Sequence, residues 1–223
     1  MSNWKYLSHR LSPNHFAYGN GKRITIEQTN SINNGDSSNN TFLNIPTHFG
    51  THLDFPYHFD ENGKKGNEYP PDYFISNKVQ IINIDISPIE NHLINKEDFT
   101  TINFKPNTEI LIIKTGMGLL LEDDKYWSAN PGFSPDLADY FKQRMSNLRI
   151  LGFDSISLTG RKYRDEGKAA HVNFLLANDI LILEDMDLSI LTPETNVEEI
   201  IISPLCFDGM DGAPVTVFAK INE

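Results

Sequence analysis

The sequence predicts a mixed α/β fold, equally described as α+β, in which one sheet system carries the helices. Short strand-like segments recur along the chain from residue 22 to residue 221. Helical patterns are confined to the second half, and no internal repeat or change of composition marks a seam between domains. A length of 223 residues fits one large domain or two small ones. We expect a single domain over residues 1–223.

The expected strands are rich in Ile and Val or alternate polar with apolar residues, as pleated strands do. They cover residues 22–28, 78–86, 109–114, 148–153, 180–183, 199–204 and 215–221. The segment 29–41, TNSINNGDSSNNT, consists of residues that hydrogen-bond to their own backbone and favour turns. It is therefore predicted to be a surface loop, and an interdomain linker is the alternative.

Two helices are predicted. The first begins with Ser134 as N-cap and Pro135 at the first helical position. A helical face is then marked by Leu137, Tyr140, Phe141, Arg144 and Leu148. The second helix covers about residues 164–177, and its expected buried face is Ala169, Ala170, Phe174 and Ala177.

Charge and composition exclude several classes of protein. The 19 basic and 30 acidic residues give a net charge of −11, which argues against nucleic acids and anionic membrane surfaces as partners. Neither a signal peptide nor an apolar stretch of ~20 residues is visible, so we expect a cytoplasmic protein. The single cysteine, Cys206, excludes an internal disulfide and cysteine-rich zinc modules. It follows the apolar run 200–202 and is expected to be buried.

The informative segment is 46–59, PTHFGTHLDFPYHF, which holds three of the seven histidines. His48, His52, Asp54 and His58 all have even numbers. In an extended chain such residues point to one face, because the side-chain period is two. A helix fits less well, since Pro56 would break it. Gly50 and Pro56 would let the segment bend around an ion.

These residue types suit a divalent metal such as Zn²⁺ or Mn²⁺, bound by imidazole nitrogen and carboxylate oxygen without a thiolate. A carboxylate such as Asp54 can bridge two ions, as two-metal hydrolytic sites require. His58 lies near enough to act in proton transfer without being a ligand. The alternative is a set of solvated loop histidines with Asp54 as a turn former.

Residues 48–59 resemble the H-x-G-T-H-x-D-x-P-x-H-F signature of the cyclase-like metal-dependent hydrolases, the family of the bacterial kynurenine formamidase and isatin hydrolase type. Further segments resemble other motifs of that family. They are 152–157 (GFDSIS), 167–171 (GKAAH), 182–184 (ILE), 204–205 (PL) and 211–215 (DGAPV). The similarity spans about residues 4–221.

The resemblance implies a set of site residues. His48, His52 and Asp54 would bind one metal ion, and Asp54, His171 and Glu184 would bind a second, so one or two Zn²⁺ or Mn²⁺ ions are expected. His58 would be the proton donor and acceptor. The residues alone leave two alternatives open. His171 on an Ala-rich helix face could be a packed histidine, and Glu184 could belong to a solvated acidic turn.

The resemblance also implies a single domain with a barrel-like mixed β core flanked by helices, of the swivelling β/β/α type, assembled as a homodimer or homotetramer. Ligands spread from His48 to Glu184 must converge in one core, which favours one domain over two. The implied reaction is hydrolysis of a small-molecule amide, formamide or lactam by metal-activated water. Two alternatives stay open: a metal-binding protein without turnover, and a metal-dependent cyclase or lyase acting on a carbonyl substrate.

The chain departs from the family pattern at two places. Thirteen positions separate His171 from Glu184, one more than the family spacing. Either the helix end differs or the second metal site is altered. Near the start, Tyr6 replaces the usual Asp before Leu-Ser, and 14–23 lacks the P-G-D pattern. Because the N-terminal segment helps to shape the substrate entrance in this family, the substrate is left open.

Overall fold

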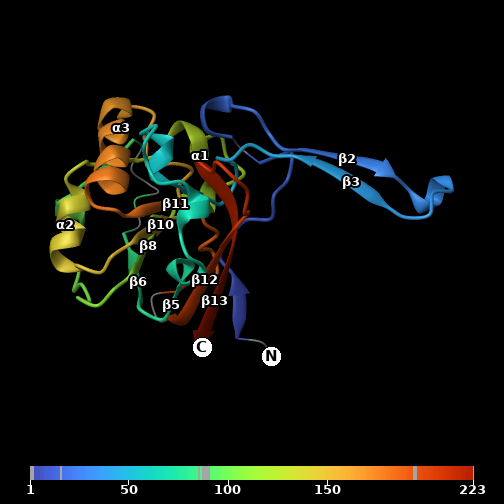
Figure 1. Cartoon of the computed structure of the whole chain (residues 1–223). Helices are drawn as coiled ribbons and strands as arrows, with labels where there is room; N and C mark the ends of the chain where they lie inside the picture. Colours follow the sequence, from blue (N-terminus) through green and yellow to red (C-terminus); the bar gives the residue numbers. More distant parts are fainter. Residues whose placement is uncertain (1–2, 16, 85, 87–90, 193–194, 223) are drawn as a thin grey trace.

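A nine-stranded mixed sheet forms the centre of the protein (Figure 1). The structure is a computed structural model, and it describes residues 3–15, 17–84, 86, 91–192 and 195–222. The sheet order is β5-β12-β13-β4-β11-β10-β8-β6, and β1 pairs with β13. The strands are β1 (Trp4–Tyr6), β4 (His52–Asp54), β5 (Ile75–Ser76), β6 (Val79–Asn83), β8 (Ile110–Lys114), β10 (Ile150–Phe153), β11 (Leu181–Glu184), β12 (Asn196–Pro204) and β13 (Gly212–Asn222).

The sheet is a nearly closed barrel with a parallel and an antiparallel half. Strands β6, β8, β10 and β11 run parallel, whereas β4, β13, β12 and β5 pair antiparallel. The two end strands, β5 and β6, follow one another in the chain with only Asn77 and Lys78 between them. Since consecutive strands form opposite ends of the sheet, its two edges come together. The barrel-like mixed α/β fold predicted from the sequence is therefore confirmed.

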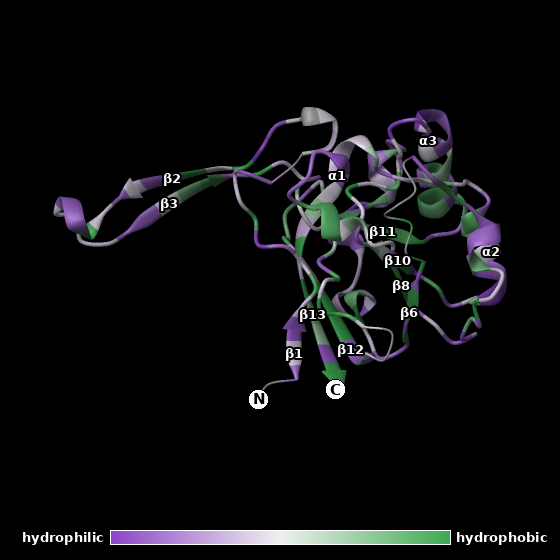
Figure 2. Cartoon of the chain, turned by 180° about the vertical axis from the view of Figure 1, so that it is seen from behind, coloured by the Kyte–Doolittle hydropathy of each residue, from purple (hydrophilic) through white to green (hydrophobic). Residues whose placement is uncertain are grey.

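The parallel strands are apolar without interruption because both of their faces are covered. All residues of β10 and β11 are buried, as are Ile110–Ile113 of β8. Figure 1 shows α2 (Leu137–Arg144) and α3 (Arg164–Val172) beside these strands, with β12 and β13 on the other side. Figure 2 shows hydrophobic residues on the central strands and hydrophilic ones on the outer side of α2.

The helices differ in detail from the prediction. Helix α2 begins at Leu137 and ends at Arg144, because 134–136 form a turn in which the Ser134 carbonyl accepts the Leu137 N–H. Helix α3 continues into a π-helical turn, Asn173–Ala177. Ala169 and Ala177 are exposed, so their predicted burial was wrong. The buried face of this helix is Gly167, Ala170, His171, Phe174 and Leu175.

The predicted loop 29–41 is the end of a hairpin. Strands β2 (Thr25–Asn30) and β3 (Asn40–Asn44) pair antiparallel, and the tip contains a 3₁₀ turn, Ile32–Asn34. Figures 1 and 2 show this hairpin projecting from the body as an arm. The sequence did not predict β3, because polar Asn and Thr residues flank its two apolar ones.

The structure also tests the predicted strands and the predicted burial of Cys206. Each of the seven predicted strands overlaps an observed strand, and residue 85 of the predicted 78–86 lies outside the described residues. Cys206 is exposed, which contradicts the prediction that it is buried. The short elements are β7 (Leu93–Ile94), β9 (Gly132–Phe133) and α1 (Lys125–Ser128). Among the described residues, none of the helices is long and apolar enough to cross a membrane.

Candidate active site

Strand β4 places His52 and Asp54 in the middle of the sheet. It lies between β11 and β13, with Glu184 opposite His52 on one side and Gly212 opposite Asp54 on the other. All three residues of β4 are buried. Because His52 and Asp54 are two positions apart on a strand, their side chains share a face. The parity expected from the sequence is present at this pair.

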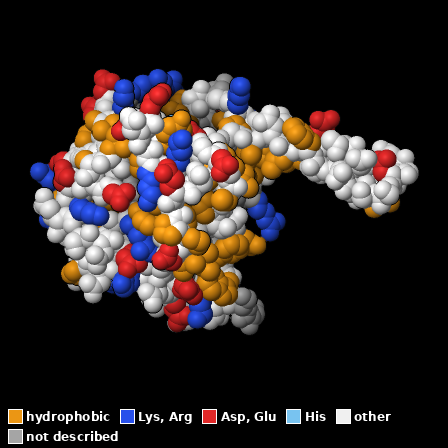
Figure 3. Space-filling model, in the orientation of Figure 1, with side chains coloured by type: hydrophobic (Ala, Val, Ile, Leu, Met, Phe, Trp, Pro, Cys, Tyr) orange, Lys and Arg blue, Asp and Glu red, His pale blue; other side chains and the backbone are white. Residues whose placement is uncertain are grey.

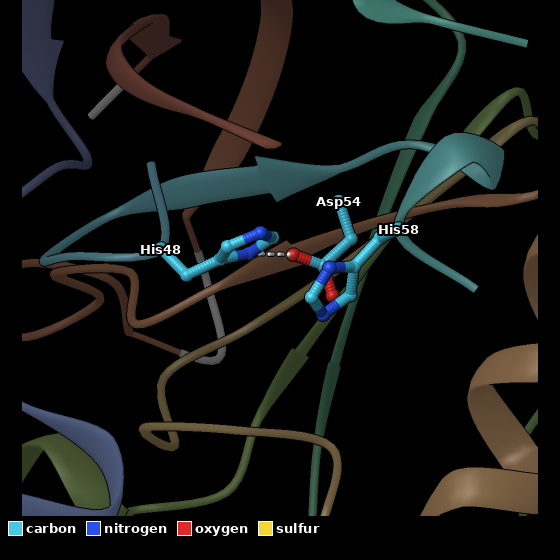
Figure 4. Close-up of side chains that lie close together, drawn as sticks. All are labelled: His48, Asp54 and His58. Atoms are coloured by element: carbon cyan, nitrogen blue, oxygen red, sulfur yellow. Dashed lines mark hydrogen bonds and ion pairs between the residues drawn. The ribbon is translucent and has the colours of Figure 1, made fainter. Parts of the chain in front are cut away.

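Turns, rather than an extended chain, bring His48 and His58 to the same place. Gly50 has a φ of 62°, a left-handed conformation that glycine adopts without strain. Pro56–His58 form a 3₁₀ turn with Pro56 at its first position. Figure 4 shows the rings of His48 and His58 beside the Asp54 carboxylate, with His48 hydrogen-bonded to it. The ring centroids of these two histidines are 4.0 Å apart.

The two oxygens of Asp54 face different histidines. Its Oδ1 lies 2.8 Å from Nδ1 of His48 and 3.4 Å from Nε2 of His52. Its Oδ2 lies 3.4 Å from Nε2 of His171. Since each carboxylate oxygen faces a different side of the cluster, Asp54 is placed to bridge two cations.

Glu184 and His171 complete the cluster despite their extra spacing. Nε2 of His171 lies 3.4 Å from Oε1 of Glu184, and Nε2 of His52 lies 3.5 Å from Oε2. The π-helical turn after α3 explains how. There the Asn178 N–H donates to the carbonyl of Asn173, five residues earlier. A π turn takes in one residue more than an α turn, and so absorbs the additional position between His171 and Glu184.

Glu184 is therefore not part of a solvated turn. Both it and His171 are buried. Oε1 of Glu184 accepts hydrogen bonds from the Leu158 N–H at 2.7 Å and the Ser157 hydroxyl at 3.2 Å. Ser157 ends the segment 152–157, which resembles a motif of the family, and Leu158 follows it directly. Their hydrogen bonds orient the Glu184 carboxylate toward the two histidines.

The histidine tautomers fit a metal ion. Nδ1 of His52 lies 2.8 Å from the Gly50 carbonyl oxygen, and Nδ1 of His171 lies 2.7 Å from that of Gly167. A carbonyl only accepts, so both Nδ1 atoms carry the hydrogen. Each Nε2 then directs a lone pair at carboxylate oxygens, and a cation must lie between them. Without a metal that cation is a proton on Nε2.

The pKa values follow from this arrangement. Burial lowers the pKa of His171, but hydrogen bonds to Asp54 and Glu184 outweigh burial and raise it to about 10. For His48, burial is likewise outweighed by Asp211 and Asp54, which raise its pKa to about 10. Burial would raise the pKa of Asp54, yet its histidine partners hold it well below the ordinary range. Buried carboxylates that stabilise positive charge on neighbouring histidines are typical of a metal site.

Sequence reasoning did not identify Asp211 as a site residue. Its Oδ2 accepts from Nε2 of His48 at 3.0 Å and lies 3.4 Å from Nδ1 of His58. The neighbouring Gly212 is equally constrained, because a Cβ there would lie 2.3 Å from Cε1 of His48. The Asp-Gly pair was visible in the sequence as part of 211–215, but nothing local indicated that it contacts His48.

Two groups of side chains have ligand atoms within 4.8 Å of one another: His48, Asp54 and His58, and His52, Asp54 and Glu184. His58 thus lies within ligand distance of His48 and Asp54. Its side chain is 33% exposed, compared with 6% for His52. His58 is the member of the cluster that solvent and a substrate reach most easily.

The cluster lies in a cavity of about 290 Å³. Ala17 and Tyr18 of the N-terminal segment line it, together with Phe59 and Ile156. The ring of Phe59 stacks on His171 with centroids 4.8 Å apart. Asp185 also lines the cavity, and it accepts a hydrogen bond from the buried Tyr126 hydroxyl. The cavity thus combines apolar and aromatic side chains with a set of polar groups, as sites for small molecules do.

Two curated relatives match most of this chain. Kynurenine formamidase of Bacillus cereus is 26% identical over 214 residues, 96% of this chain and 95% of the relative. That of Bacillus thuringiensis subsp. konkukian is 27% identical over 194 residues, 87% of this chain and 83% of the relative.

Solved structures share the fold. Isatin hydrolase A from Ralstonia solanacearum superposes with a TM-score of 0.76 at 18% identity, covering 99% of this chain and 92% of that one. A potential metal-dependent hydrolase with cyclase activity gives 0.75 at 18% identity, covering 99% and 98%.

The family model described as putative cyclase matches residues 6–159. That range includes the whole of β4 and both turns that carry His48 and His58, and it exceeds half of the 223 residues. The chain therefore belongs to the cyclase family.

Proposed function

We propose that this protein is a metal-dependent hydrolase that cleaves the C–N bond of a small-molecule amide, either a formamide or a lactam. The observation that carries the proposal is the Asp54 carboxylate, whose two oxygens face separate histidines inside a cavity open to a small ligand. The similarity to kynurenine formamidases and the fold shared with isatin hydrolase support an amide substrate.

The site residues fall into two groups, one for each of two ions. His48, His52 and Asp54 would hold one, and Asp54, His171 and Glu184 the second. Imidazole nitrogen and carboxylate oxygen suit Zn²⁺ or Mn²⁺. When bound, the ion polarises the amide carbonyl and lowers the pKa of water to about 7. His48 donates to carboxylates from both nitrogens, so it must lose a proton before it can bind metal.

His58 is the proposed proton donor and acceptor. Asp211 accepts the hydrogen of His58 Nδ1 and leaves Nε2 with a lone pair. Nε2 takes a proton from the attacking water and returns it to the leaving nitrogen, which balances the hydrolysis. The stacked ring of His48 limits the rotation of His58. Asp211 is therefore a positioning residue that fixes the tautomer of His58.

The cavity restricts the substrate to small molecules, because about 290 Å³ lies at the lower end of ligand sites. Phe59, Tyr18 and Ile156 offer apolar surface beside the polar cluster. An aryl amide fits this division, with its ring against the apolar wall and its amide toward Asp54. The N-terminal segment supplies Tyr18, so its departures from the family pattern act directly on substrate choice.

The test combines metal analysis of the purified protein with hydrolysis of N-formylkynurenine and isatin, followed by product mass. We expect one or two Zn²⁺ or Mn²⁺ ions per chain and a product heavier than substrate by one water, or its equivalent in two fragments. His58→Ala should retain metal and lose a factor of about 10²–10⁴ in rate.

Three results would count against the proposal, and a fourth would count against the role of His58. A folded, metal-free protein that gains no activity with Zn²⁺ or Mn²⁺ would refute metal-dependent hydrolysis. Bound metal without turnover on a wide amide panel would indicate a binding protein. Loss of water from the substrate would indicate a cyclase. Unchanged activity in His58→Ala would remove His58 from the mechanism.

A further inference from the structure

The basic segment, residues 160–164, carries three cations directly before and at the start of helix α3. Arg161, Lys162 and Arg164 are all exposed. None of them forms an ion pair with a carboxylate of the described residues. Figure 3 shows Lys and Arg side chains, with a few acidic ones among them, along the upper edge of the body, where Figure 1 places α1 and α3. In a chain with a net charge of −11, these unpaired cations attract an anion to this end of the molecule.

The backbone of the basic segment packs closely against the body beside the active-site cavity. Thr159, directly before the segment, lines that cavity. The Tyr163 N–H donates to the Gly160 carbonyl at 3.1 Å, which closes a turn with Arg161 at a central position. A Cβ at Gly160 would lie 2.5 Å from a main-chain nitrogen of β9. Because the turn is packed this tightly, it fixes Arg161 close to the cavity.

Arg164 lies on the face of α3 that carries His171. Positions 164, 167 and 171 are separated by three and four residues, so their side chains share one face of the helix. Gly167 and His171 are buried, and Gly167 packs so closely on the cavity residue Thr159 that a Cβ would lie 2.5 Å from its Oγ1. Arg164 forms the exposed end of this face. Seven residues (171 − 164) separate it from His171, which is about 10 Å along the helix axis.

Tyr18 and Trp127 connect the two arginines with the cavity. Tyr18 lines the cavity, and its ring meets that of Trp127 edge-on with centroids 5.1 Å apart. The guanidinium carbon of Arg161 lies 6.0 Å from the centroid of the Trp127 ring. Burial raises the pKa of the Tyr18 hydroxyl, the charge of Arg164 lowers it, and that of Glu184 raises it. The Tyr18 hydroxyl is thus close to both Arg164 and the buried carboxylates, so the basic segment stands at the mouth of the cavity.

A carboxylate at the outer end of the substrate suits this mouth. Guanidinium groups bind carboxylate oxygens through paired N–H donors. With the amide at the Asp54 cluster, the ring of an aryl amide lies against Phe59 and Tyr18. A substituent on the far side of that ring then points toward Arg161 and Arg164. An ammonium group at the same place would be repelled by these cations.

We propose that the substrate is an aryl amide with a carboxylate on the far side of its ring, and that Arg161 and Arg164 bind this carboxylate. The two arginines then select a negatively charged substrate over a neutral one. They also select it over a zwitterion that carries an additional ammonium group at the same end. The inference rests on the proposed hydrolytic function for the amide, whereas the anion subsite can be measured by binding alone.

Isothermal titration calorimetry of the protein as purified tests the subsite without turnover. Phenylpropanoate and phenylpropanol are suitable probes, because they differ only in the end group. We expect the carboxylate to bind at least about tenfold more tightly, since charge-assisted hydrogen bonds are roughly twice as strong as neutral ones. The preference should decrease at high salt. The double variant Arg161→Gln/Arg164→Gln should abolish it.

Lys168→Gln is the matched control for the loss of positive charge. Lys168 is exposed on the same helix, but it lines a separate depression together with Asp165 and Ala169. This variant should bind phenylpropanoate as tightly as wild type does. A loss of affinity equal to that of the double arginine variant would show that only the overall charge matters, and would overturn the subsite.

Hydrolysis of three formamides tests the selection in the reaction. para-Formamidophenylpropanoate carries the carboxylate, para-formamidophenylalanine adds an ammonium group, and formanilide has neither. In wild type, kcat/KM for the propanoate should exceed that for each of the other two at least about tenfold. The double arginine variant should lose this difference through a higher KM and keep its rate on formanilide.

The outcomes separate this inference from the proposed function. Equal hydrolysis of the three formamides by wild type would overturn the anion subsite and support the hydrolase. An affinity for phenylpropanoate that the double arginine variant leaves unchanged would also overturn the subsite, because the carboxylate then binds elsewhere, for example at a metal ion. A charge preference in binding that the variant removes, without hydrolysis of any formamide, would support the subsite and count against the hydrolytic function.

Discussion

Gly212→Ala tests whether the Asp-Gly pair at the start of β13 exists to accommodate His48. A Cβ at position 212 would lie 2.3 Å from Cε1 of His48 and 2.8 Å from each ring nitrogen. Carbon atoms pack at about 3.5–4.0 Å, so the ring must move by more than about 1 Å. This displacement breaks the His48 hydrogen bonds to Asp54 and Asp211, which measure 2.8 Å and 3.0 Å.

The magnitude follows from two terms. Overpacking costs about 1–3 kcal/mol, and each lost hydrogen bond between charged groups costs about 1.5–3 kcal/mol, less where the side chain is partly exposed. His48 is 25% exposed, so each of its two bonds counts for only about 1 kcal/mol, and we expect Gly212→Ala to lower the unfolding free energy of the metal-free protein by about 3–5 kcal/mol. A shift of about 1 Å in the site should also reduce the hydrolysis rate about a hundredfold.

Urea denaturation in the presence of a chelator measures the stability change, and two variants isolate its cause. In a His48→Ala background the clash disappears, so Gly212→Ala should become neutral or stabilise by about 0.4–1 kcal/mol through the unfolded chain. Gly209→Ala changes the turn just before β13, at a position where an added Cβ meets no atom within 4 Å but φ is 76°. It controls for backbone strain and should keep the rate. An equal penalty for Gly212→Ala in both backgrounds would refute the reasoning.

Four further predictions concern charged groups in and near the site. Because His171 has a pKa of about 10 in the folded metal-free protein against 6.5 ordinarily, its stabilising contribution is complete below pH 6.5 and disappears as the pH rises to about 10. Asp54 has a lowered pKa, so its contribution is present above the ordinary 3.8 and is lost in acid. Urea midpoints of the metal-free protein should therefore peak between these limits, and a midpoint that rises toward pH 10 would contradict the assignment. Metal affinity should show the opposite trend and increase over the same alkaline range, with proton release in calorimetry. Asp154→Asn should lower the unfolding free energy by about 2–4 kcal/mol, because the Asp154 carboxylate accepts hydrogen bonds from the main-chain N–H groups of Thr115 and Gly116 at 2.7 and 3.1 Å. An unfolding free energy within about 0.5 kcal/mol of wild type, as for a neutral surface change, would show that these bonds are dispensable. Asp211→Asn should keep its metal and lower kcat at least about tenfold, with the pH profile shifted, whereas loss of metal instead would make Asp211 part of the metal site.

Local sequence patterns predicted much of the fold. The buried parallel strands are visible because covering both faces makes them uniformly apolar. Boundaries were less certain, as at Ser134, where a turn takes the place of the predicted first helical residues. The arm was missed because its second strand, β3, is mostly polar and exposed. In the absence of burial, no hydrophobic alternation distinguishes such a strand from a loop.

Some contacts of the candidate site could likewise be predicted from the sequence, and others could not. The spacing of His52 and Asp54 fixed their common face, since it depends only on the strand period. The spacing of His171 and Glu184 did not show whether their side chains meet. Whether these two residues meet depends on a π-helical turn, which is a tertiary compromise between helix packing and chain length.

By itself the sequence determined which chemistry is available: histidines and carboxylates without a thiolate set, in an acidic chain with one cysteine. Residue types and short spacings carry that information, because they do not depend on what lies across the fold. Only the tertiary structure decided that the Asp211 carboxylate contacts the ring of His58, although the two residues lie 153 positions apart (211 − 58). It likewise decided that Gly212 leaves room for the ring of His48. Such contacts arise when β13 pairs with β4 in the closed sheet, and no local pattern encodes that pairing.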